Sequence, residues 1–110
     1  LGTRAIFTER VDGKMTFRRG FSLHERERVL IVEDIVTTGG SIKEVIDVVK
    51  AAGAVPVAVS MLVDRSGGKA TFGDVPCAAL LTMNVETYTP ETCPLCAKGI
   101  PMTKRGRTGK

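Results

Sequence analysis

The chain has 110 residues, 43% of them apolar and 25% charged, so we expect one globular domain over residues 1–110 and exclude bulk disorder. No apolar run approaches the roughly 20 residues of a membrane-spanning helix. No signal-peptide pattern opens the chain, and we therefore expect a cytoplasmic protein without a membrane partner.

The net charge of +4 is concentrated in one segment. Residues 97–110 hold five basic residues and no acidic one, whereas the other 96 residues hold 11 basic and 12 acidic groups. A basic tail of this kind can meet phosphate-bearing partners. The favoured interpretation is a flexible, solvated terminus, because chain ends are usually poorly ordered. Nucleic-acid binding is not expected, since the rest of the chain is close to neutral.

Residues 5–19 have the pattern of a β-hairpin. The segments AIFTERV and KMTFRR flank Asp12-Gly13, a pair that suits the two central positions of a type I′ turn. Pairing across this turn sets Val11 opposite Lys14, with Arg10 one residue further from the tip. Two interpretations stay open: the charges protect an exposed hairpin from edge-to-edge pairing, or the tip is a functional basic loop.

Three apolar runs predict buried strands of one sheet. They are residues 28–32 (RVLIV), 55–63 (VPVAVSMLV) and 77–83 (CAALLTM). Nearly continuous apolar runs are typical of strands that are covered on both faces. Residues 86–101 contain three prolines and predict an ordered loop rather than a helix.

An amphipathic helix is predicted between the first two runs, beginning at Ser41. Its apolar face consists of residues at helical spacing, namely Ile42, Val45, Ile46 and Val49. Ser41 and Glu44 match a capping box, and Gly53 suits the C′ position after the helix. Strand, helix and strand form a βαβ unit. The expected fold class is therefore α/β, with a mainly parallel sheet flanked by helices and a separate β-hairpin.

The loop EDIVTTGGS, residues 33–41, is the candidate site, because ligands of such sheets bind outside the carboxyl ends of the strands. Within it, Thr37–Ser41 supplies hydroxyl groups, glycines that allow close approach, and the N–H groups of a helix N-terminus, all of which suit a phosphate. The loop has neither the Gly-Lys-Ser/Thr of a Walker motif nor a G-x-G-x-x-G pattern. A nucleoside triphosphate or a dinucleotide is therefore disfavoured.

Glu33 and Asp34 place negative charge beside this anion site. Two carboxylates can bind sugar hydroxyls, hold a hydrated Mg²⁺ or stabilise a developing positive charge, and a phosphorylated ribose would use all three. Each half of the loop also has a simpler explanation: acids at a strand end can accept from backbone N–H groups, and Thr-Thr-Gly-Gly can be an ordinary turn. The ordered combination of strand, acids, loop and helix favours the ribose phosphate.

The segment VLIVEDIVTTGGS resembles the phosphoribosyl-pyrophosphate loop of the type I phosphoribosyltransferases, and its form is most similar to the orotate phosphoribosyltransferase branch. Three further segments carry this resemblance over nearly the whole chain: LVDRSGG at 62–68, VETYTPETCPLC at 85–96 and FTERVDGKMTFRRGF at 7–21. The resemblance implies a phosphoribosyltransferase fold and transfer of a phosphoribosyl group to orotate, giving orotidine 5′-phosphate and pyrophosphate.

The resemblance also implies site residues. Those that would enclose the ribose 5-phosphate of phosphoribosyl pyrophosphate are Glu33, Asp34, Ile35, Val36, Thr37, Thr38, Gly39, Gly40 and Ser41. Orotate would meet Thr37 and Arg65, and a guanidinium suits an anionic pyrimidine carboxylate. The alternative for Arg65 is a surface arginine paired with its neighbour Asp64.

The family implies a basic loop over pyrophosphate, which places Arg10 and Lys14 among the donor-binding residues, with Lys14 and Asp34 as the catalytic residues. It further implies Mg²⁺, held mainly by the donor and water rather than by a protein site, and a homodimer. This sequence departs from the family at the hairpin tip, which is short and lacks the usual run of lysines and histidine. The identity of the catalytic lysine therefore stays open.

The family fold has a strand, a short pyrophosphate-binding loop and a helix before the hairpin, and the chain begins at Leu1 without them. We therefore expect a carboxyl-terminal portion of a longer enzyme, poorly active by itself. Two other functions stay open: a purine-type phosphoribosyltransferase, and a non-enzymatic regulator of the same fold that binds RNA.

Cys77, Cys93 and Cys96 form no even disulfide set, which favours a reducing compartment. The pair in Cys93-Pro-Leu-Cys96 could be half of a zinc site or a redox pair. Zinc needs two further ligands, and the spacings of Cys77 and His24 do not suit it. A packed turn stiffened by proline is the favoured interpretation.

Overall fold

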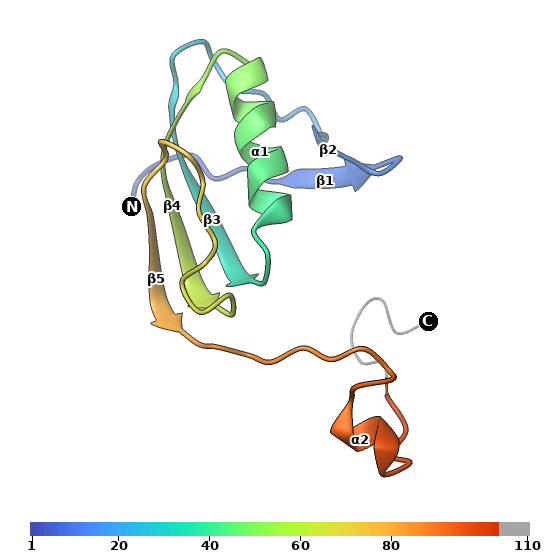
Figure 1. Ribbon diagram of the computed structural model, residues 1–110. Helices are drawn as coiled ribbons and strands as arrows, with labels where there is room; N and C mark the ends of the chain where they lie inside the picture. The colour runs from blue at the N-terminus through green and yellow to red at the C-terminus, as the bar shows by residue number, and fades with distance from the viewer. Residues whose placement is uncertain (104–110) are drawn as a thin grey trace.

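The computed structural model describes residues 1–103, and residues 104–110 of the predicted basic tail lie outside the described residues. Two sheets, one long helix and one short helix make up the described part of the chain (Figure 1). In chain order the elements are β1 (Thr8–Val11), β2 (Lys14–Phe17), β3 (Arg28–Val36), α1 (Gly40–Ala51), β4 (Val55–Asp64), β5 (Cys77–Thr82) and α2 (Pro94–Ala97).

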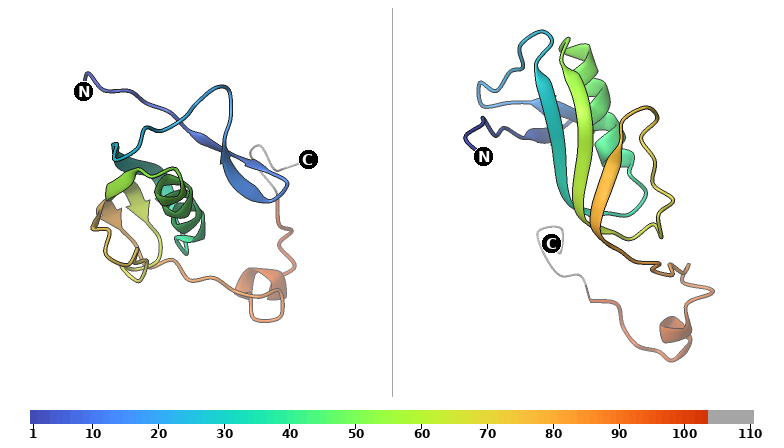
Figure 2. Two further views of the ribbon diagram at one scale, coloured as in Figure 1. Left: turned by 90° about the horizontal axis from the view of Figure 1, so that it is seen from above. Right: turned by 90° about the vertical axis from the view of Figure 1, so that its left-hand side faces the viewer.

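The predicted hairpin is confirmed. Strands β1 and β2 pair antiparallel, with Val11 opposite Lys14 and Arg10 opposite Met15. At the tip, Asp12 and Gly13 both have positive φ, 49° and 79°, as a type I′ turn requires. The hairpin lies beside α1 and outside the larger sheet (Figure 2).

The predicted βαβ unit is also confirmed: β3, β4 and β5 form a parallel sheet in that order, with α1 between β3 and β4 in the chain (Figure 1). Helix α1 covers one face of this sheet (Figure 2). The core lies beneath it and combines Ile42 and Ile46 of α1 with Val59 and Met61 of β4. Phe72, in the connection between β4 and β5, completes this cluster.

The expected capping box at the start of α1 is wrong. The helix is capped by Gly39, whose φ is 82°, and no side chain makes a capping hydrogen bond. Because the N-cap is Gly39 rather than Ser41, Glu44 lies beyond the N3 position that a capping box requires, and its carboxylate is bound by Arg10 of the hairpin. The other end behaves as predicted: Gly53 has a φ of 79° and donates its N–H to the carbonyl oxygen of Lys50.

The expectation that the strands are covered on both faces is wrong for the described residues. The face opposite α1 is open, and four large apolar side chains on it are 49–83% exposed: Leu30, Val32, Leu62 and Leu80. Figure 2 shows this face without a helix or loop over it. Strand β5, predicted to be buried, is therefore exposed along most of its length. We call this surface the open face.

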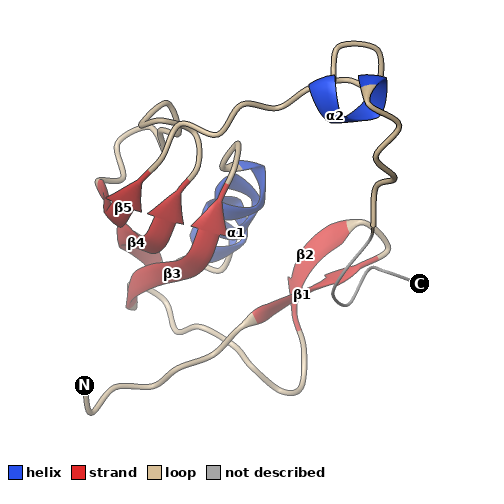
Figure 3. Cartoon of the chain, turned by 90° about the horizontal axis from the view of Figure 1, so that it is seen from below, coloured by secondary structure: helices blue, strands red, loops and turns tan. Residues whose placement is uncertain are grey.

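After β5 the chain runs away from the sheet to α2 (Figure 3). The prediction of a loop over residues 86–101 is wrong for Pro94–Ala97, which form one helical turn that begins with a proline. None of the residues of α2 is buried, so the turn around Cys93 is not packed as expected. Over residues 1–103, no helix combines the length and the hydropathy that crossing a membrane requires.

Candidate functional site

The carboxyl end of β3 and the start of α1 enclose a small polar pocket, which we call the cradle. Its volume is about 150 Å³, enough for one phosphate group rather than a large ligand. It is lined by Glu33, Ile35, Val36, Thr37, Thr38, Gly39, Gly40, Ser41 and Ile42. These residues include all of Thr37–Ser41, so the structure gathers the predicted hydroxyl and glycine groups around one space.

The shape of the cradle depends on Gly39. Its φ of +82° is unfavourable for other residues, and a Cβ there would lie 2.9 Å from Cε1 of the buried Phe72. The chain turns at this point, and the N–H of Gly40 donates to the Thr38 hydroxyl at 3.4 Å. Since the helix begins at Gly40 without a side-chain cap, its N-terminal end faces the cradle with donors that suit an anion.

A second polar cavity of about 330 Å³ adjoins the cradle, and we call it the side pocket. It is lined by Thr37, Thr38, Arg65, Ser66, Lys69, Ala70, Asn84, Val85 and Thr87. Thr37 and Thr38 line both spaces, so a ligand that fills the two would pass across these threonines.

Side-chain hydrogen bonds hold together the loop that follows β4. One carboxylate oxygen of Asp64 accepts from the Ser66 N–H at 2.8 Å and from the Ser66 hydroxyl at 2.6 Å. The Ser66 hydroxyl oxygen in turn accepts from the N–H of Ala70 at 2.8 Å. The bonds from Ser66 lower the pKa of Asp64, so this buried side chain remains a carboxylate. Asp64 is therefore engaged by Ser66 and is not paired with Arg65, the alternative raised for that arginine.

The loop is also tied to the neighbouring strands. The N–H of Arg65 donates to the carbonyl oxygen of Val36 at 2.8 Å, which links the side pocket to the end of β3. Gly67 donates to the carbonyl oxygen of Met83 at 3.0 Å, and Ser66 pairs with Asn84 beyond β5. The side pocket is thus built where the carboxyl ends of three parallel strands meet.

The two acids take different positions. Glu33 lines the cradle, whereas Asp34 lies beside Ser60 and Leu62 and lines neither the cradle nor the side pocket. Burial, and then the neighbouring Asp34, raise the pKa of Glu33. The pKa of Asp34 is lowered, first by the hydrogen bond from the N–H of Ile35, at 2.7 Å, and then by Glu33. At acidic pH the proton is thus held by Glu33 while Asp34 stays charged.

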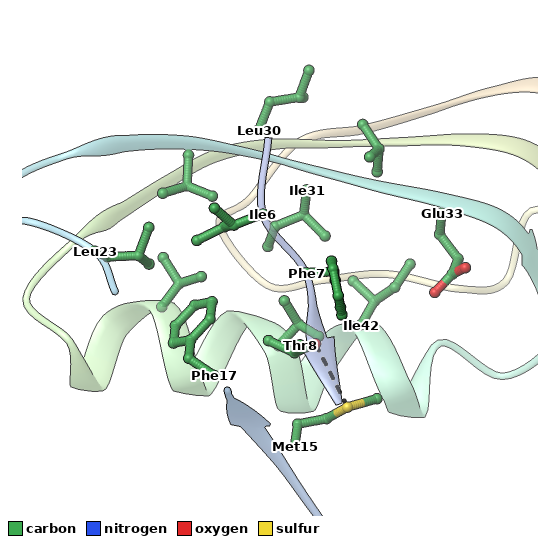
Figure 4. A pocket seen from close by; sticks show the side chains of 14 residues that line it. Ile6, Phe7, Thr8, Met15, Phe17, Leu23, Leu30, Ile31, Glu33 and Ile42 are labelled. Carbon is green, nitrogen blue, oxygen red and sulfur yellow. Dashed lines mark hydrogen bonds between the residues drawn. The ribbon is translucent and has the colours of Figure 1, made fainter. Parts of the chain in front are cut away.

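The burial of Glu33 has a visible cause. An apolar pocket of about 350 Å³ lies between the hairpin, α1 and β3, and Glu33 lies at one end of it (Figure 4). Apolar side chains such as Phe17 and Ile31 line this pocket, and among the described residues Glu33 is the only charged one in its lining. The carboxylate therefore has an apolar wall on one side and the cradle on the other.

The hairpin residues lie outside both polar pockets. Arg10 donates to the two carboxylate oxygens of Glu44 at 2.9 and 3.1 Å, and to the carbonyl oxygen of Gly13 at 2.6 Å. Lys14 lines neither the cradle nor the side pocket. Glu44 is in the first turns of α1, so Arg10 is held near the helix end that faces the cradle.

No cluster of three or more His, Cys, Asp or Glu side chains suited to a metal ion occurs within residues 1–103. The oxygen donors of Glu33 and Asp34 suit Mg²⁺, which takes most of its ligands from phosphates and water when a protein offers only one or two carboxylates.

Six side-pocket residues are not among the predicted site residues, and four of them are polar: Ser66, Lys69, Asn84 and Thr87. The signal that could have found them is their place in the chain, since ligands bind beyond the carboxyl ends of parallel strands and these residues follow β4 and β5.

Comparison with known families finds one match, described as the phosphoribosyl transferase domain, over residues 4–77. The chain is 58% identical to an orotate phosphoribosyltransferase of Desulforamulus reducens over 106 residues, which cover 96% of this chain and 55% of that protein. It is 51% identical to an orotate phosphoribosyltransferase of Thermotoga maritima, covering 99% of this chain and 58% of the other. The chain thus spans about half the length of these relatives.

Solved structures agree on the fold. A crystal structure of an adenine phosphoribosyltransferase from Thermoanaerobacter pseudethanolicus superposes with a TM-score of 0.56 at 20% identity, covering 74% of this chain and 51% of that one. A second adenine phosphoribosyltransferase, from Rhodothermus marinus, gives a TM-score of 0.52 with the same identity and the same coverage of this chain. At this identity the likeness concerns the arrangement of strands and helices.

Proposed function

This chain belongs to the phosphoribosyl transferase domain family, and from that premise we propose that the whole protein transfers a phosphoribosyl group to orotate. The donor is 5-phosphoribosyl 1-pyrophosphate, and the products are orotidine 5′-phosphate and pyrophosphate. Relatives at 51–58% identity that carry the name orotate phosphoribosyltransferase support this choice of acceptor.

One observation carries the proposal: the cradle and the side pocket meet at Thr37 and Thr38. A nucleoside monophosphate has a phosphate at one end and a base at the other. The cradle suits the 5′-phosphate, because it combines hydroxyl groups with the N-terminal end of α1. The side pocket suits the base, because Arg65 can pair with the carboxylate that distinguishes orotate from other pyrimidines.

In the proposed reaction, N1 of orotate loses its proton to solvent and attacks C1 of the ribose, while the bond from C1 to pyrophosphate breaks and pyrophosphate leaves with the bonding electrons. Positive charge develops on the ribose, and the carboxylate of Glu33, which lines the cradle, stabilises it. Asp34 joins it once its side chain turns from Ser60 and Leu62 toward the ribose. Asp34, proposed as catalytic, stays ionised because its pKa is lowered by the N–H of Ile35. Thr37 and Arg65 orient orotate, and Thr37–Ser41 hold the phosphate.

The leaving pyrophosphate needs positive charge from elsewhere. We propose that Arg10 and Lys14 supply it from the hairpin, with Lys14 as the catalytic residue, once the hairpin has moved toward the cradle. Mg²⁺ bound to the donor would neutralise phosphate charge. We further propose that the enzyme is a cytoplasmic homodimer and that this chain is part of one phosphoribosyltransferase domain.

The direct test uses the whole protein with phosphoribosyl pyrophosphate, Mg²⁺ and one base at a time, following the loss of orotate absorbance. Turnover of orotate, with none of adenine or hypoxanthine, is expected. Arg65→Gln should raise the KM for orotate much more than the KM for the donor. Turnover of a purine instead of orotate would refute the proposal, and so would RNA binding without turnover of any base. The 110-residue chain alone is expected to be poorly active.

A further inference from the structure

We propose that Lys69 is a second cationic contact for the carboxylate of orotate, and that with Arg65 it sets the preference of the side pocket for an acidic base. This inference rests on the proposed function and adds to it a residue that determines specificity. The observation behind it is that the charged residues lining the side pocket are both cations, Arg65 and Lys69.

The position of Lys69 follows from the hydrogen bonds of its loop. Ser66 is held by Asp64, and the N–H of Ala70 donates to the Ser66 hydroxyl oxygen at 2.8 Å. Ala70 is buried at 8% exposure and packs in the core. Lys69 therefore sits directly before an anchored residue, at the opposite end of the loop from Arg65. The loop closes on itself, and both side chains border the same cavity.

The charges around the pocket favour an anion there. Two acids adjoin lining residues in the chain, Asp64 and Glu86, and neither lines the pocket. Asp64 uses a carboxylate oxygen inside the loop, on Ser66, and Glu86 accepts from the hydroxyl of Tyr88. Neither Arg65 nor Lys69 has a side-chain hydrogen bond or an ion pair to another residue within the part of the chain described here. Both cations are thus available to a ligand.

Arg65 and Lys69 can bind different parts of the same ligand. A guanidinium pairs side by side with a carboxylate, and an ammonium is a mobile point charge that can reach the remaining lone pairs of the same group or a neighbouring ring oxygen. Uracil has the same ring without the carboxylate, so it would gain little from Lys69. The contribution of Lys69 should therefore appear as discrimination between orotate and uracil.

The test uses the whole protein and the variants Lys69→Gln and Lys69→Arg. Losing one charge-assisted contact should raise the KM for orotate about 10- to 100-fold in Lys69→Gln. The KM for phosphoribosyl pyrophosphate should stay within about twofold. The arginine variant should recover most of the affinity, because it keeps the positive charge. The ratio of kcat/KM for orotate to kcat/KM for uracil should decrease in Lys69→Gln. General damage to the site would lower both values and leave this ratio unchanged.

Lys50→Gln serves as the matched control. Lys50 is an exposed lysine of α1 whose ammonium pairs with Asp74 at 3.6 Å, away from both polar pockets. This variant should keep the wild-type KM for orotate. If Lys69→Gln also keeps it while the wild type turns over orotate, the role of Lys69 is refuted and the proposed function stands. If the wild type does not use orotate, the proposed function itself fails and this inference fails with it.

Discussion

Arg10 of the hairpin and Glu44 of α1 are joined by two hydrogen bonds of 2.9 and 3.1 Å between guanidinium and carboxylate. The same guanidinium donates to the carbonyl oxygen of Gly13, so the hairpin tip is fastened to the helix by one side chain. Arg10 is also a residue we propose for pyrophosphate binding. In the structure the carboxylate of Glu44 takes up the guanidinium that we propose for pyrophosphate.

Removing Arg10 and removing Glu44 should therefore have different effects on the KM for phosphoribosyl pyrophosphate. Arg10→Ala should raise the KM for phosphoribosyl pyrophosphate by about tenfold, since a charge-assisted contact is lost. Glu44→Ala should not raise it, because the arginine no longer has to leave a competing carboxylate. Steady-state kinetics of the whole protein measure both values. A larger rise in the glutamate variant would contradict this account.

The same pair should contribute little to stability. Both side chains are more than 40% exposed, so solvent screens their attraction. A double-mutant cycle with Arg10→Ala and Glu44→Ala, followed by urea unfolding, should give a coupling of less than about 1 kcal/mol that falls as salt is added. A coupling that is large and independent of salt would show that the contact is more than a surface ion pair.

Gly39 should be the least replaceable residue of the cradle. An added Cβ would face both a φ of +82° and the ring of Phe72 at 2.9 Å. Gly39→Ala is expected to lower the free energy of unfolding by at least about 1 kcal/mol and to raise the KM for the donor. Gly40→Ala is the matched control for stability, because its Cβ would meet only Thr38, at an ordinary 3.6 Å. Equal losses of stability in the two variants would refute this explanation.

Glu33 should make activity and stability respond to pH in opposite ways. Burial raises its pKa above the ordinary value of 4.5, so the fold favours the protonated form. Its contribution to stability is therefore present below that ordinary value and is lost as pH rises through the raised pKa. In the proposed reaction the carboxylate stabilises the charge on the ribose, so activity should fall as pH decreases over the same interval.

Glu33→Gln separates the two effects. The variant should be more resistant to urea than the wild type at pH 7, and this advantage should shrink as pH falls toward the ordinary pKa of a glutamate. Its kcat should be reduced, and the acidic limb due to Glu33 should disappear from the pH profile. If Glu33→Gln is less stable than the wild type at pH 7, burial of the Glu33 carboxylate does not destabilise the fold.

Cys93 should react with alkylating agents faster than Cys96. The N–H of Cys96, followed by the thiol of Cys96, lowers the pKa of Cys93, while the hydrogen bond to Cys93 raises the pKa of Cys96. Because the thiolate is the reactive form, brief treatment with iodoacetamide at pH 7 should label Cys93 first, although Cys96 is more exposed. Peptide mass spectrometry reads the order. Faster labelling of Cys96 would mean that exposure outweighs pKa.

Local patterns predicted much of the fold correctly. Asp12-Gly13 specified the turn and register of the hairpin, since few residue pairs accept positive φ at both positions. The spacing of Ile42, Ile46 and Val49 predicted the buried face of α1. These features depend on neighbours in the chain, and sequence periodicity reports them directly.

Features that depend on distant residues were predicted poorly. The capping box failed because the helix already begins at Gly40, after a turn at Gly39 that lies against the distant Phe72, and local spacing does not report such a contact. Lys69 and Asn84 were missed because only the sheet brings their two loops to one cavity. The apolar runs of β3 and β5 predicted burial on both faces, whereas the described residues cover only one face.

The open face of the sheet determines how this chain should behave in solution. Leu30, Val32, Leu62 and Leu80 come from three adjacent strands and form one apolar surface. When two such surfaces come together, apolar area is removed from water, and this favours the association of two chains sheet against sheet. The 110-residue chain alone should sediment as an oligomer that dissociates on dilution. Val32→Thr with Leu62→Gln should shift it to monomer, and an unchanged sedimentation coefficient would place the association elsewhere.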